Sequence, residues 1–172
     1  MEEKNPVTLA RETALRRLNR RECSSLDMRR HLSKKGFSSS TIQEVVTSLT
    51  EQNLISDQRY ARLLTREQSM RGKGPYWIQQ KLREKGVSLN LDDTKALRDE
   101  VSNVTEIEGV QEILLRRFPD ACKEKKEALR ATQTLLRRGF SFSVIREALG
   151  RLGESLALEE NKEEDTFSSK PD

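Results

Sequence analysis

The chain has 172 residues, of which 35% are charged and 34% are hydrophobic. This composition supports only a lean core and argues against a large enzyme built around a deep apolar pocket. Only four prolines and eight glycines interrupt the chain. Leu far outnumbers Val and Ile, which favours helices over a sheet. We therefore expect an all-α fold.

The charge is unevenly distributed. Lys and Arg number 32 and Asp and Glu 28, which gives a net charge of +4. Residues 153–172 carry a net charge of −5, so the preceding residues carry +9. A basic body favours a polyanionic or acidic partner. The acidic segment can either compete with that partner for the basic surface or simply aid solubility.

The cysteines and the one histidine do not form a recognisable site. Cys23 and Cys122 are far apart, there is no Cys-x-x-Cys pair, and His31 has no nucleophile at a motif spacing around it. The glycine-rich stretch 72–75 lacks the spacing of a phosphate-binding loop. The sequence thus predicts no metal site, no cofactor and no enzymatic activity. Without a signal-like or membrane-spanning apolar run, we expect a cytoplasmic protein with no membrane partner.

Hydrophobic periodicity and capping residues predict nine short helices. The first three are residues 8–20, a helix that begins after Ser24 and ends at Gly36, and a helix that is capped by the cluster 38–40 and runs through Leu49. Of the next three, one begins at Ser56 and Asp57, one runs from Pro75 to Gly86, and one runs from about 90 to 104. The last three run from Ile107 to Phe118, over 121–138, and from Ser141 or Ser143 to Leu152.

An internal repeat of about 50 residues organises these helices. The segment from Leu32 to Ser38 matches the segments from Leu82 to Ser88 and from Leu135 to Ser141. Each contains a glycine after a basic residue, at the expected end of the second helix of a three-helix unit. A single unit is too small to be stable alone, so we expect neighbouring units to share a core.

The predicted architecture is three tandem three-helix repeats that form an elongated, curved rod. The repeats cover residues 8–53, 54–104 and 105–152, and residues 153–172 form an acidic, disordered tail. Function is then expected on an extended surface rather than in a pocket. We also expect Trp77, a large anchor in a lean core, to join the first two units.

Basic residues recur on the second helix of each unit. If the units stack with a common rotation, these residues line one positively charged surface suited to a polyanion. Some of the cations also stabilise their own helix through its dipole. The candidate binding residues are Arg29, Arg30 and Lys34 in the first unit, Arg71, Lys73, Lys81 and Arg83 in the second, and Arg130, Arg137 and Arg138 in the third.

A central stretch of the sequence resembles a known family. Residues 54–61, Leu-Ile-Ser-Asp-Gln-Arg-Tyr-Ala, and the later Gly74-Pro75 with Ile78 resemble the RecX family of bacterial recombination regulators. The first and last repeats fit the family as well, so the resemblance covers about residues 8–152. Positions that match the family's signature are Asp57, Arg59, Tyr60, Gly74 and Pro75.

The resemblance implies a function. RecX proteins bind the RecA recombinase as a filament on single-stranded DNA and modulate it, usually by inhibition. They lie in the filament groove and hinder ATP hydrolysis, strand exchange and co-protease activity. The expected partners are thus the RecA filament and the single-stranded DNA within it, and a monomer is expected. Two alternatives remain: a basic helical module that binds DNA without recombinase, and an adaptor that binds only protein.

Overall fold

The structure, a computed structural model, describes residues 5–102 and 104–167, and within these residues the regular secondary structure is all helix, joined by turns and loops. The all-α prediction is confirmed. The helices are α1 (Pro6–Leu18), α2 (Ser25–Lys34), α3 (Ser39–Glu51), α4 (Asp57–Met70), α5 (Pro75–Glu84), α6 (Leu91–Ser102), α7 (Glu106–Arg117), α8 (Lys125–Arg137) and α9 (Phe142–Phe167).

Local capping explains where many of these helices begin. The hydroxyls of Ser24, Ser38 and Ser56 each accept a hydrogen bond from the backbone N–H three residues later. Such bonds satisfy N–H groups that have no partner within the helix. At the start of α7, Thr105 and Glu108 form a reciprocal capping box. The first helix begins at Pro6 with Asn5 as its cap, slightly before the predicted start.

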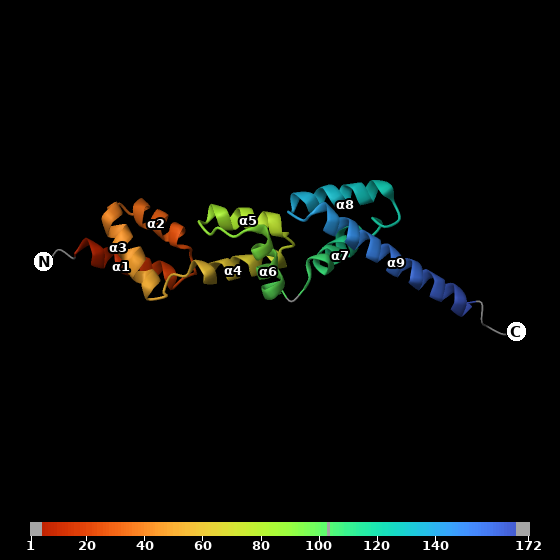
Figure 1. The fold of residues 1–172 in the computed structure, drawn as a ribbon, viewed down its shortest axis with the longest axis horizontal. Coiled ribbons are helices and arrows are strands. Elements are labelled where there is room, and N and C mark those ends of the chain that lie inside the picture. The colour runs from red at the N-terminus through yellow and green to blue at the C-terminus, as the bar shows by residue number, and fades with distance from the viewer. Residues whose placement is uncertain (1–4, 103, 168–172) are drawn as a thin grey trace.

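The helices follow one another in three groups, α1–α3, α4–α6 and α7–α9, along an elongated molecule with the termini at opposite ends (Figure 1). The most extensive helix contacts, such as α1 with α3, α4 with α6 and α7 with α9, lie within a group. We call these groups units one, two and three. The arrangement confirms the predicted elongated helical repeat, whereas the predicted unit boundaries stay predictions.

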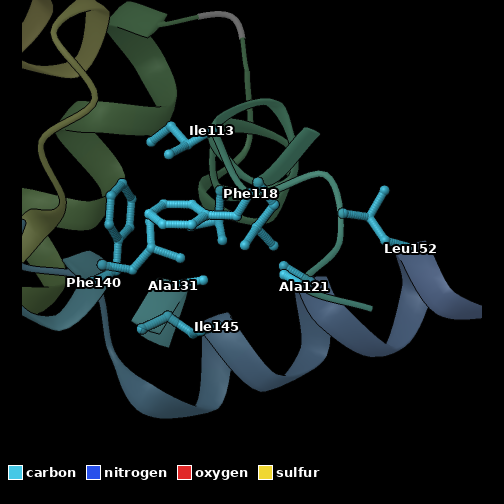
Figure 2. Packing of buried hydrophobic residues seen from close by; sticks show 11 residues of the cluster. Ile113, Phe118, Ala121, Ala131, Phe140, Ile145 and Leu152 are labelled. Carbon is cyan, nitrogen blue, oxygen red and sulfur yellow. The ribbon is translucent and has the colours of Figure 1, made fainter. Parts of the chain in front are cut away.

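Each unit has its own hydrophobic cluster, so the expectation of a core shared between units is wrong. Unit one packs around residues such as Met28, Leu32 and Leu49. The cluster of unit two is smaller, with Ala61, Ile78, Leu82 and Val87 buried. In unit three, Phe118 and Phe140 point into the space between α7 and α9, near Ile113 and Ile145 (Figure 2). The units are therefore held together by something other than a common core.

The last helix departs from the prediction. Helix α9 continues through Gly150 and Gly153 to Phe167, whereas the sequence predicts a helix end at Leu152 and disorder beyond it. Most residues between 154 and 167 are good helix formers such as Glu, Leu, Ala and Lys, and they can extend a helix that packing has already started. The remainder of the predicted tail, residues 168–172, lies outside the described residues.

Candidate binding surface

The second helices of the three units succeed one another along one side of the molecule. In Figure 1, α2, α5 and α8 lie in a row along the upper edge. The C-terminal end of α8 meets the N-terminal end of α5, and the C-terminal end of α5 meets the N-terminal end of α2. We call this row the second-helix line. The helix dipoles are therefore aligned head to tail, which is electrostatically favourable.

Backbone hydrogen bonds close the joint between units two and three. The N–H of Gly74 donates to the carbonyl of Arg138 at 2.8 Å, and the N–H of Tyr76 donates to the carbonyl of Gly139 at 3.1 Å. These bonds replace a side-chain cap, which α5 lacks. The Arg138 guanidinium also donates to the carbonyls of Arg71 and Gly72 at 3.3 and 3.2 Å. Arg138 thus clamps the joint from both its backbone and its side chain.

Gly74 has a steric reason to be glycine. A Cβ atom at this position would overlap the backbone carbonyl of Gly139 and come within 2.6 Å of the backbone nitrogen of Phe140. The next residue, Pro75, occupies the first helical position, where its missing N–H costs nothing. The Gly-Pro signature is therefore explained by the close approach of two units.

The joint between units one and two uses side chains instead. The carboxylate of Asp57 accepts hydrogen bonds from both the N–H and the hydroxyl of Ser25, each at 2.7 Å. At the other edge of the joint, Lys85 pairs with Asp27 at 3.0 Å. Arg30 donates to the carbonyl of Glu84 at 3.2 Å. Contacts from the start of α4 and the end of α5 thus hold α2 in place.

Arg59 and Tyr60, the other signature residues, also have structural surroundings. The Arg59 guanidinium pairs with Glu22 and donates to the carbonyls of Asn53 and Leu54 near the end of α3. It therefore fixes the connection between α3 and α4 against the loop before α2. The Tyr60 ring packs against the cluster of unit two. Its partial burial raises the pKa of its hydroxyl.

We predict that Asp57→Ala destabilises the protein by about 1–3 kcal/mol, because it removes two hydrogen bonds to a charged acceptor and leaves the Ser25 N–H without that partner. Urea unfolding followed by circular dichroism would measure this change. The matched control is Gln58→Ala on the same turn of α4, where the side chain is exposed and the expected change is within about 0.5 kcal/mol. Equal midpoints for the two variants would contradict the assigned function of Asp57.

The other predicted binding residues are distributed along the second-helix line. Each of its three helices carries at least one cation that is exposed to solvent, and Arg71 is exposed in the turn before α5. Arg130 lies 3.5 Å from Glu127 on its own helix, and the partly buried Arg29 donates to Gln43 of α3. The predicted binding residues that are exposed on these helices are Arg30 and Lys34 on α2, Arg83 on α5, and Arg130 and Arg137 on α8.

Trp77 lies at the joint between units two and three, so the prediction that it joins units one and two is wrong. A Cβ atom on Gly139 would lie 2.6 Å from the Cβ of Trp77, which shows how closely α8 approaches it. Two predicted binding residues flank the indole: the ammonium of Lys73 is 4.6 Å and that of Lys81 is 6.0 Å from the ring centroid. Both distances are within the range of cation–π attraction. Lys81 also pairs with Glu84 at 2.8 Å.

Two groups of charged residues were missed by sequence reasoning. The first is Arg98, whose side chain is only 3% exposed between α6 and α7 and near the buried carboxyl of Glu106, whose pKa is raised by burial. The second is the group Arg16, Arg17, Arg20 and Arg21, which lines a hollow with His31 and Lys35. The spacing i, i+1, i+4, i+5 of these four arginines was the available signal, because it places them on adjoining parts of one helical face.

The described residues contain no helix that is both long and apolar enough to cross a membrane. Both cysteines are free thiols, Cys23 buried and Cys122 partly buried. The features that stand out are therefore the two joints and the row of second helices, with their exposed cations, that the joints align. Together they define an extended tandem helical-repeat protein.

Sequence comparisons assign this array to a family. Residues 10–49 match the first three-helix domain of RecX, and residues 56–91 match its second three-helix domain. Regulatory protein RecX of Halorhodospira halophila is 34% identical, over 80% of this chain and 84% of the relative. The protein of the same name from Syntrophotalea carbinolica is 32% identical, over 81% of this chain and 94% of the relative. The chain belongs to the RecX family of regulatory proteins.

Solved structures support the same fold. The crystal structure of RecX from Lactobacillus salivarius superimposes with a TM-score of 0.74, over 86% of this chain and 96% of that chain, at 22% sequence identity. The fold is therefore retained although most residues differ. Because the three-unit array spans nearly the whole of that structure, the extended arrangement is a property of the fold and not of this sequence alone.

Proposed function

We propose that this protein regulates the RecA recombinase by binding the filament that RecA forms on single-stranded DNA. The observation that carries the proposal is the second-helix line, in which three helices of separate units, each with exposed cations, lie along one side of an elongated molecule. A filament offers a partner of matching length that displays repeated acidic and phosphate groups. Many weak contacts along such a line add up to strong binding that depends on salt.

The proposed mechanism involves no chemical step by this chain. The protein lies in the filament groove, across neighbouring recombinase protomers, and stabilises one state of the filament. A ligand shifts such an equilibrium only by its difference in affinity for the two states. Binding of this kind inhibits ATP hydrolysis, strand exchange and co-protease activity together. We further propose that the protein acts as a monomer in the cytoplasm.

The function of the candidate residues follows from their surroundings. Lys34, Arg83 and Arg137 are exposed on the second-helix line and are proposed to contact the filament. Arg138 and Gly74 act by holding units two and three in the orientation that aligns those cations. This second effect is indirect, and it is expected to change affinity only through the shape of the array.

The decisive test is DNA-dependent ATP hydrolysis by purified RecA while this protein is added at fixed salt. We expect suppression at amounts below one molecule per RecA protomer, because each molecule spans more than one protomer. A parallel titration measures binding to the same DNA without RecA. Tight binding to bare DNA without any effect on hydrolysis would overturn the proposal and favour a DNA-binding module that acts alone.

A further inference from the structure

A basic pocket in unit one contains none of the candidate binding residues of the second-helix line. It is a hollow of about 510 Å³ between the end of α1 and helix α2. Arg16, Arg17, Arg20 and Arg21 line it from α1 and the turn that follows, and His31 and Lys35 line it from α2. We call this hollow the α1–α2 pocket. No carboxylate is among its described lining residues, so its positive charge is not neutralised from within.

The pocket lies on a different face of α2 from the second-helix candidates. Arg29, Arg30 and Lys34 border a separate hollow on the α3 side of the helix, whereas His31 and Lys35 face α1. Nearby acidic residues are engaged elsewhere: Glu22 pairs with Arg59 and Asp27 pairs with Lys85. The fold thus gathers cations around one hollow and ties neighbouring carboxylates to the joint between units.

Arg17 and His31, which both line the pocket, contact each other. The Arg17 guanidinium lies 3.3 Å from Nδ1 of His31. Because a guanidinium only donates, this contact is a hydrogen bond when Nδ1 accepts, that is, in the neutral tautomer that carries its proton on Nε2. Burial lowers the pKa of His31 below its ordinary value of 6.5, and the charges of Arg17, Lys35, Arg21 and Lys34 lower it further. The Nε of Arg17 is buried without a hydrogen-bond partner.

We propose that the α1–α2 pocket binds the phosphodiester backbone of single-stranded nucleic acid. Planar guanidinium groups match the oxygens of a phosphate in a paired geometry. Every described residue that lines the pocket has a polar or charged side chain, and none is an aliphatic anchor of the kind on which docked peptides usually rely. A volume of about 510 Å³ leaves room for more than one phosphate group.

The acidic C-terminal segment of the same molecule is not the occupant. The pocket lies in unit one, and α9 extends away from unit three at the opposite end of the molecule (Figure 1). A bound phosphate instead supplies the missing negative charge beside His31. Binding then favours the protonated ring, in which Nδ1 no longer accepts from Arg17. The pKa of His31 therefore rises, and the affinity for the nucleic acid increases as the pH falls through that pKa.

The test uses the fact that the chain has one histidine. NMR titration of its ring signals against pH, with and without a short oligothymidylate, measures the pKa of His31 directly. We expect an upward shift when the oligonucleotide is bound. Binding of the oligonucleotide with no change at His31 would overturn the proposal. The proposal would also be overturned if polyglutamate but not the oligonucleotide shifted the pKa of His31, or if inorganic phosphate alone shifted it.

A pair of double variants tests the same site by affinity. Arg20→Gln with Arg21→Gln removes two exposed pocket cations, and Lys125→Gln with Lys126→Gln removes two exposed cations at the start of α8. We expect the pocket variant to reduce the slope of log affinity against log salt by about 0.7 for each phosphate that it no longer neutralises, and to abolish the His31 shift. The α8 variant should keep the shift. If the oligonucleotide shifted the pKa of His31 equally in both variants, the assignment of the binding site to this pocket would be wrong.

Neither measurement contains RecA, so its outcome is independent of the proposed regulation. Failure at the α1–α2 pocket leaves the second-helix line as the filament-binding surface. Conversely, a pocket that binds DNA in a protein without effect on RecA would retain this inference while the proposed function fails.

Discussion

Replacing Gly139 with alanine is expected to destabilise the protein by about 2–4 kcal/mol, because two costs add at this position. The backbone of Gly139 has a positive φ of 88°, which disfavours a residue with a Cβ by about 1 kcal/mol. The new Cβ would also overlap the backbone of Trp77 and lie 2.6 Å from its Cβ. Backbone atoms cannot move aside as a flexible side chain can, so the joint between units two and three must open.

Gly36→Ala is the matched control for this prediction. Gly36 ends the second helix of unit one with nearly the same φ of 87°, and a Cβ there would meet nothing within 4 Å. Gly36→Ala should therefore cost only the conformational part, about 1 kcal/mol. Denaturant unfolding measures the free energy of unfolding of both variants, and the difference between their losses gives the cost of the steric overlap at Gly139. Equal losses of stability would mean that the two units do not approach each other as closely as described.

The repeat could be predicted because its signals are local. Leu32, Leu82 and Leu135 occupy matching positions, and all three are fully buried. The glycines after them have positive φ, as expected at the end of a helix. Such features depend on a few neighbouring residues, and the sequence displays them directly. The division into three-helix groups followed from them.

The joints could not be predicted, because they depend on contacts between residues distant in the sequence. Asp57 reaches Ser25, and Gly74 donates to Arg138, across 32 and 64 positions. A single sequence does not show which units approach or how closely. For the same reason Trp77 was assigned to the wrong joint. The shared core failed as a prediction because hydrogen-bonded helix ends connect the units instead.

The candidate site was predictable in composition but not in detail. The recurrence of cations on second helices indicated the second-helix line, yet residue type alone could not separate Arg138, which clamps a joint, from its exposed neighbour Arg137. The α1–α2 pocket was missed because its arginines precede the first repeated motif. Their convergence with His31 depends on how α1 packs beside α2, which a helical pattern does not specify.

Reversing one exposed cation on each second helix is expected to weaken regulation strongly without affecting folding. The triple variant Lys34→Glu, Arg83→Glu and Arg137→Glu changes three side chains that are exposed to solvent. If each reversal weakens binding by about 1 kcal/mol, the concentration needed for half suppression of RecA ATP hydrolysis rises on the order of a hundredfold. The thermal unfolding midpoint should stay close to that of the unchanged protein.

The matched control carries the same change in charge on other helices. Arg66, Arg116 and Arg146 are exposed on α4, α7 and α9, and their reversal to Glu alters net charge equally. If the geometry of the second-helix line determines binding, this control should keep most of its effect on RecA at the same salt. If the two triple variants lose activity equally, net charge rather than the line would be responsible, and the alignment of α2, α5 and α8 would have no part in recognition.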